Sequence, residues 1–216
     1  MPVSPALVTE STQIAARAAI GAALLAVAAL AVLHAVRRDL DPGWHVISEY
    51  AVGARGWIMG LCFAAFAAAS LALGAALIGQ LPTLTGRIGL ACLIAAGVGL
   101  ALAALFPMDP ITTAPADASL SGRMHGVSFM IGVPGEILAV LLLSLALRAR
   151  PDWAGAPLLP LTAVIWISLV VMAAGILLAS KGGMNGPGLL GWANRLLMIG
   201  YAAWIAVVAW PLARWG

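Results

Sequence analysis

The sequence predicts an all-α, polytopic membrane helix bundle with six transmembrane helices, on three observations. Hydrophobic residues make up 63% of the 216 residues and charged residues only 9%, whereas a soluble globular chain carries about 25% charged residues. The mean hydropathy is +1.06. Six apolar stretches each approach the roughly 20 residues that a helix needs to cross the membrane. So few charges cannot cover a soluble protein of this size, and we expect lipid to be its solvent.

Helix-breaking residues separate the six apolar stretches. The expected spans cover residues 14–36, 57–79, 87–106, 124–147, 157–179 and 190–212. The breaks are Asp41-Pro42-Gly43, Gln80-Leu81-Pro82, residues 107–115, Arg150-Pro151-Asp152 and residues 181–188. Proline and glycine in these breaks end helices. Because lipid offers backbone groups no partner, each span must be a helix, and strands of a barrel would alternate in polarity.

The organisation that follows is one six-helix domain over residues 14–212, with an N-terminal leader at 1–13 and a tail at 213–216. The first span is longer than the 7–15 residues of a signal-peptide core, and no basic segment precedes it. The apolar residues between Trp44 and Val52 predict a short interfacial or re-entrant helix after the first span. The net charge of +3 is not gathered into a basic patch with aromatic residues, so nucleic acid is not an expected partner.

An even number of spans places both termini on one membrane face. The connections at 37–56, 107–123 and 180–191 then share the opposite face. The basic residues number six on the face of these connections and five on the face of the termini, so the positive-inside rule does not choose between them. We place the termini in the cytoplasm, because some cations of the opposite face have candidate site roles.

The first connection holds His45 and Glu49, which are four residues apart and share one face of a helix. One interpretation is a base and a carboxylate that act together, or two metal ligands. The other is a capping and ion-pair arrangement that fixes the loop. Ser48 lies between them.

The connection at 107–123, the second on this face, holds Asp109 between two prolines, which hold the backbone extended. It is either a turn residue that ends the helix or an acid directed into the site. His125 opens the next span, where an imidazole serves as base, donor or ligand; a hydrogen-bonded structural role is the alternative.

Glu136 is the most costly residue in the chain, because it lies near the middle of a span. A carboxylate there costs on the order of 3 kcal/mol on insertion scales. It follows Gly132-Val133-Pro134-Gly135, which predicts a kink. Glu136 is eleven residues after His125, which puts both on one helical stripe about 16 Å apart. It is either functional or hydrogen-bonded to a neighbouring helix.

Asn194 and Arg195 lie one turn into the last span. Arg195 is expected to pair with Glu49, with Asp109 or with an anionic substrate group, or else to extend to the headgroups. Together with the first two connections, these residues predict one polar site at one membrane face. His45, Glu49, Asp109 and His125 are its candidate catalytic residues and the candidate ligands of a divalent metal such as zinc. Ser48, Glu136, Asn194 and Arg195 are its candidate substrate-binding residues.

Three short motifs resemble a known membrane family. They are His45-x2-Ser48-Glu49, Phe106-Pro107-x-Asp109-Pro110 before Gly122-x2-His125, and Asn194-Arg195 ahead of Trp210. The chain resembles the multi-pass family called domain of unknown function 998 from about Asp41 to Trp210. The resemblance implies a bundle of six or more spans and polar positions at Ser48, Glu49, Asp109, His125 and Arg195, but no reaction.

Three functions remain open from the sequence. The first is an enzyme, such as a hydrolase, that acts on a lipid or other amphiphile by acid–base or metal-assisted chemistry. The second is a structural, assembly or cofactor-holding subunit of a membrane complex, in which two of His34, His45 and His125 would ligate haem. The third is a small proton-coupled transporter that uses Glu136. Membrane lipids are expected neighbours, and glycine pairs such as Gly56-x3-Gly60 and Gly122-x3-Gly126 suit a tight monomer or a homodimer.

Overall fold

The computed structural model describes residues 8–110, 113–182 and 188–214. This described part contains six long helices and no strand. The helices are α1 Glu10–Val36, α2 Gly56–Leu77, α3 Leu84–Leu105, α4 Leu120–Leu147, α5 Leu158–Gly182 and α6 Leu189–Arg214. Each of them is long and apolar enough to cross a membrane. The predicted six-helix membrane bundle is therefore confirmed.

Hydroxyl side chains determine where three of the helices begin. The Thr9 Oγ1 atom accepts a hydrogen bond from the backbone N–H of Thr12 at the start of α1. Thr83 and Ser119 cap α3 and α4 in the same way. These three helices begin three or four residues before the expected spans, because hydropathy marks the first apolar residue whereas the cap satisfies the first turn.

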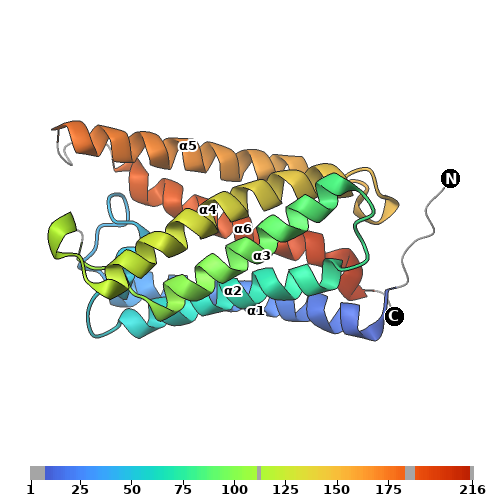
Figure 1. Cartoon of the computed structure of the whole chain (residues 1–216), viewed down its shortest axis with the longest axis horizontal. Helices are drawn as coiled ribbons and strands as arrows, with labels where there is room; N and C mark the ends of the chain where they lie inside the picture. Colours follow the sequence, from blue (N-terminus) through green and yellow to red (C-terminus); the bar gives the residue numbers. More distant parts are fainter. Residues whose placement is uncertain (1–7, 111–112, 183–187, 215–216) are drawn as a thin grey trace.

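The helices form an elongated bundle with two unlike ends (Figure 1). The start of α1 and the end of α6 lie at one end. Residues 37–55, 106–110 and 113–119, which connect the helices, lie at the other end, together with the end of α5 and the start of α6. We call this second end the loop end. The polar residues of the three motifs are therefore gathered at one end of the bundle or just below it.

Glycines bring α3 and α4 into backbone contact. A Cβ atom on Gly99 would lie 2.5 Å from Gly132 Cα, and one on Gly135 would lie 2.8 Å from the Ala96 nitrogen. The close approach thus uses Gly99, Gly132 and Gly135. A Cβ on Gly126, by contrast, would meet nothing within 4 Å. Pro134 lies inside α4, which remains one continuous helix.

The short interfacial or re-entrant helix expected after the first span is not confirmed. The structure has a five-residue 3-10 helix there, η1 Ile47–Ala51. Ile47, Glu49 and Tyr50 are buried in it, so its side chains pack against the bundle. Gly53 follows with φ +97°, a conformation that glycine adopts readily, and this turn leads the chain into α2.

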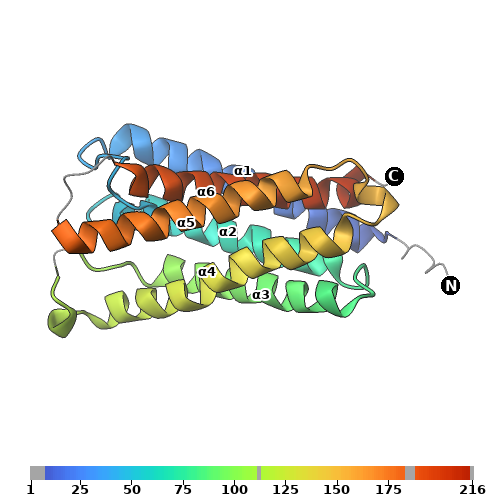
Figure 2. The same cartoon turned by 90° about the horizontal axis from the view of Figure 1, so that it is seen from above.

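Helices α4 and α5 are joined at the end opposite the loops. Ser144 of α4 and Thr162 of α5 are hydrogen-bonded at 2.9 Å, and Trp204 of α6 donates to the same Ser144 hydroxyl at 2.9 Å. From this junction α4 and α5 diverge toward the loop end (Figures 1 and 2). Their divergence separates α4 from α6 in the half of the bundle that carries the polar residues.

Candidate functional site

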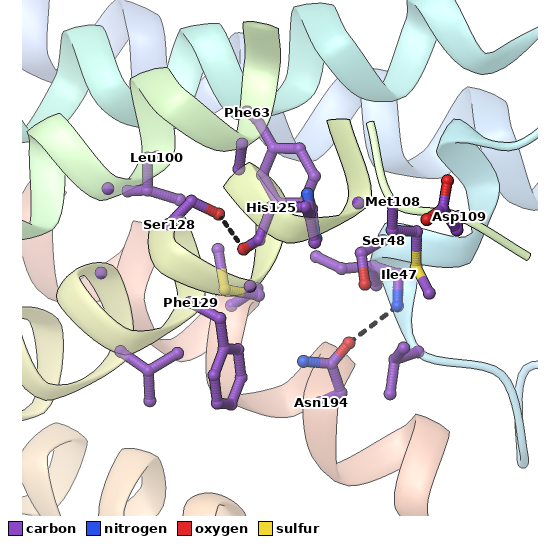
Figure 3. Close-up of a pocket in the computed structure, with 18 of the residues that line it drawn as sticks. Ile47, Ser48, Phe63, Leu100, Met108, Asp109, His125, Ser128, Phe129 and Asn194 are labelled. Carbon is purple, nitrogen blue, oxygen red and sulfur yellow. Dashed lines mark hydrogen bonds between the residues drawn. The ribbon is translucent and has the colours of Figure 1, made fainter. Parts of the chain in front are cut away.

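A cavity of about 490 Å³ lies at the loop end, where α4 diverges from α5 (Figure 3). Five helices line it, together with the connection between α1 and α2 and the connection between α3 and α4. Apolar residues supply most of the wall; among them are Phe63 of α2, Leu100 of α3, Phe129 of α4, Met172 of α5 and Leu197 of α6. A cavity of this volume is within the range of pockets that hold small organic ligands.

Five of the eight candidate site residues line this cavity. They are Ser48, Asp109, His125, Glu136 and Asn194. Asn194 Oδ1 accepts a hydrogen bond of 2.8 Å from the backbone N–H of Ile47, which ties η1 to α6 (Figure 3). His45, Glu49 and Arg195 are absent from the lining and form a second group beside it. The predicted single site is therefore divided in two.

His125 presents its imidazole to the cavity in a fixed orientation. Its Nδ1 atom is 2.9 Å from the carbonyl oxygen of Phe106. Since a carbonyl only accepts, Nδ1 carries the proton. In the neutral ring Nε2 is then the acceptor nitrogen. The ring also lies against Phe63, with centroids 6.1 Å apart.

Glu136 is the buried acid of the cavity wall. Its side chain is 3% exposed, and its Oε1 atom has no hydrogen-bond partner among the described residues. None of the three ion pairs between described residues includes it. The alternative of a hydrogen bond to a neighbouring helix is therefore not realised at Oε1, and a buried polar atom without a partner is costly.

Asp109 holds Ser119, the residue that caps α4. Its Oδ2 atom accepts from the Ser119 backbone N–H at 2.8 Å and its Oδ1 atom from the Ser119 hydroxyl at 2.6 Å. These two hydrogen bonds, with a smaller contribution from the charge of Arg123, lower the pKa of the Asp109 carboxyl. The carboxylate also fills the space beside Gly122, where a Cβ would overlap it.

His45 and Glu49 take up the capping arrangement. His45 Nδ1 and Glu49 Oε2 are 2.7 Å apart, and Glu49 Oε1 accepts from the Val46 backbone N–H at 3.0 Å. The Glu49 carboxylate therefore uses both oxygens within the loop. Its side chain is 7% exposed and that of His45 is 24% exposed, so the pair fixes η1 against the bundle.

Arg195 is buried and is surrounded by uncharged acceptors. Its Nε donates to His34 Nε2 at 2.6 Å, Nη1 donates to the His45 carbonyl at 2.6 Å and the Gly191 carbonyl at 2.9 Å, and Nη2 donates to the Tyr50 hydroxyl at 2.9 Å. We call these five residues the Arg195 cluster. The expected pairing with Glu49 or Asp109 is not among these contacts, and at 2% exposure the side chain does not extend to headgroups.

The candidate metal ligands do not come together. Between them, the described residues provide no group of three or more His, Cys, Asp or Glu side chains that could hold a metal ion. Asp109 is engaged with Ser119, His125 with Phe106, and His45 with Glu49. The geometry thus offers hydrogen-bonding groups and one buried acid to a ligand.

A family model decides the relationship of this chain to other proteins. The model described as "Protein of unknown function (DUF998)" matches residues 20–211. The chain belongs to the DUF998 family. No curated protein matches it, and no solved structure matches it. Family membership confirms the resemblance carried by the three motifs and adds no reaction.

Sequence reasoning missed that residues exposed on the surface of this DUF998 chain also line the cavity. Phe129 of α4 and Ile176 of α5 line the cavity and are 48% and 47% exposed. They belong to the two helices that diverge toward the loop end. Apolar residues on a span look alike in the sequence whether they face lipid or a cavity, so no sequence signal separates this pair from the residues around it.

Proposed function

We propose that this membrane protein binds an amphiphilic molecule between α4 and α5. The apolar part of the ligand lies against the cavity wall, and its polar group reaches Glu136. The observation that carries the proposal is the unpartnered Oε1 atom of Glu136 in the wall of a largely apolar cavity. Ligand sites combine such a wall with a few placed polar groups.

We propose that the ligand enters the cavity from the side, between α4 and α5, and this side opening favours an amphiphile over a water-soluble ligand. Phe129 and Ile176 border the cavity and are about half exposed on the surface of spanning helices. That surface faces hydrocarbon in a membrane. A molecule dissolved in the bilayer therefore has a short path into the cavity, where its polar group meets Glu136; Ser48, His125 and Asn194 line the same cavity nearer the loop end.

Binding accounts for the geometry better than catalysis by a convergent polar site. The His45–Glu49 pair is engaged in the loop and Arg195 in its own cluster. His125 and Glu136 are three helical turns apart on α4, about 16 Å. Groups at that separation act on different ends of a ligand.

A second candidate is an enzyme that acts on the same amphiphile near the loop end. The orientation of His125 favours it, because the Phe106 carbonyl holds the proton on Nδ1 and leaves Nε2 as a base in the cavity wall. Turnover of a lipid ester that is lost in His125→Ala and kept in Glu136→Gln would establish it. Equal turnover by wild type and His125→Ala would exclude this role for the histidine.

Photolabelling with a neutral, diazirine-bearing decanol tests the binding proposal. Gly126 lines the cavity and a Cβ atom added there would meet nothing within 4 Å, so Gly126→Leu adds an apolar side chain at the cavity wall. Gly21→Leu is the matched control, since Gly21 of α1 is also empty to 4 Å but lies outside the lining. We expect labels on Phe129 and Leu197 in wild type and Gly21→Leu and their loss in Gly126→Leu. Labelling of these residues that Gly126→Leu leaves unchanged would refute the proposal.

A further inference from the structure

We infer that the ligand of this cavity carries a positive charge, as an amine or quaternary ammonium group on an apolar body, and that Glu136 is its counter-ion. The inference rests on the proposed binding function and specifies its ligand class. It follows from the charges of the cavity wall, from the isolation of Glu136 and from the aromatic residues along the opening.

We call the part of the wall farther from the loop end, to which Glu136 belongs, the inner wall. Gly132 and Val133 precede Glu136 by one turn of α4, and Leu197 and Met198 of α6 also line the cavity; none of these side chains offers a charge or a hydrogen-bond donor. No described Arg, Lys or His side chain forms an ion pair with Glu136. A cationic group is therefore the partner that this acid lacks.

The charged residues nearer the loop end do not remove the preference for a cationic ligand. Arg123 is the one Arg or Lys in the described lining, and its charge acts on Asp109, which lines the same region. Arg195 is buried in its own cluster outside the lining. An anionic head group would thus find no unpaired cation on the inner wall, and it would meet the Glu136 carboxyl there.

Aromatic rings lie where a cation would pass. Phe129 lines the cavity and is 48% exposed on the surface of α4, and Phe63 lies beside His125 (Figure 3). The faces of such rings attract ammonium groups, and more strongly where water is excluded. Met172 and Met198 supply flexible, polarizable surface for the apolar body. The wall therefore combines the Glu136 carboxyl, two phenyl rings and apolar surface, which suits an amphiphilic amine.

Three probes that share the same decyl tail and differ in their head group test the inference on the protein in zwitterionic nanodiscs. They are decyltrimethylammonium, decanol and decyl sulfate, each measured by equilibrium dialysis against empty discs. We expect wild type to bind decyltrimethylammonium about tenfold or more tighter than decanol, since charge-assisted contacts add at least that factor. Glu136→Gln should bind the two equally, and Glu10→Gln, which removes a charge at the start of α1, should behave as wild type.

The outcomes separate this inference from the binding proposal. Equal binding of decanol and decyltrimethylammonium by wild type, or a charge preference that survives Glu136→Gln, overturns the cationic ligand and leaves amphiphile binding in place. Tighter binding of decyl sulfate does the same. Failure of all three probes to bind above empty discs overturns both.

Discussion

Arg195 Nε donates a hydrogen bond to His34 Nε2, and the 2.6 Å contact joins the last spanning helix to the first. His34 Nδ1 is 2.7 Å from the Leu30 carbonyl. Since neither Arg195 nor the carbonyl can reverse its role, His34 is held as the neutral tautomer with its proton on Nδ1. The buried guanidinium is thus satisfied by dipoles, and the Arg195 cluster joins α1, η1 and α6 beside the cavity.

Replacing Arg195 by Lys should destabilise the protein by about 1–3 kcal/mol or more, because a point ammonium cannot reach acceptors placed around a planar guanidinium. The acceptors on His34, Tyr50 and His45 would lose donors in a buried place. The measurement is the melting temperature of the purified protein in detergent. Arg17→Lys is the control, since Arg17 makes one hydrogen bond to the Ala213 carbonyl. Equal melting of the two variants would contradict the role of the cluster.

Asp109→Asn should lower stability at neutral pH, and the difference from wild type should shrink in acid. The folded pKa of Asp109 is depressed by its bonds from Ser119. Its contribution is therefore present above its unfolded pKa of about 3.9 and is lost as pH falls through the folded value. Thermal melting at pH 7 and at about pH 3 measures the change. Asp117→Asn, in the same connection, is the control. A difference that is the same at both pH values would show that the charge of the Asp109 carboxylate does not stabilise the Ser119 cap.

The fold was predictable because lipid imposes one rule on every segment. Backbone groups in hydrocarbon must bond within a helix, so hydropathy alone located all six spans. Hydropathy could not predict which helices contact one another. The contact of Gly99 with Gly132 and the divergence of α4 from α5 depend on packing between segments, which the apolar composition of a span leaves open.

The sequence predicts which residues belong to the candidate site, but it does not predict which of them contact one another. The cost of burial singled out Glu136, and polar residues in alternate connections singled out His125 and Asn194. No sequence pattern predicts that Arg195 pairs with His34, because that contact joins residues 161 positions apart. The sequence also does not show that both Glu49 carboxylate oxygens bond within the loop, because the capping and catalytic interpretations of His45 and Glu49 require the same four-residue spacing.

Gly99→Ala should destabilise the bundle by about 1–3 kcal/mol, the usual cost of overpacking. Its Cβ would lie 2.5 Å from Gly132 Cα and 2.8 Å from the Ser128 carbonyl oxygen, and backbone atoms cannot move aside as a side chain can. Gly132→Ala is the matched control on the facing helix. Its Cβ would meet Gly99 Cα at an ordinary 3.5 Å, and alanine improves helix propensity. Melting in detergent distinguishes them; a Gly99→Ala protein as stable as Gly132→Ala would contradict the backbone contact.

Ser144→Ala should destabilise the junction of α4, α5 and α6 by about 1–2 kcal/mol, the upper range for hydrogen bonds between membrane helices. The Trp204 indole N–H and the Thr162 hydroxyl both lose their contact with Ser144. Ser168→Ala is the control, because Ser168 is equally buried and bonds the Val164 carbonyl of its own helix. We expect a lower melting temperature and faster hydrogen exchange in α5 for Ser144→Ala alone. If both variants behave alike, the divergence of α4 and α5 does not start from this junction.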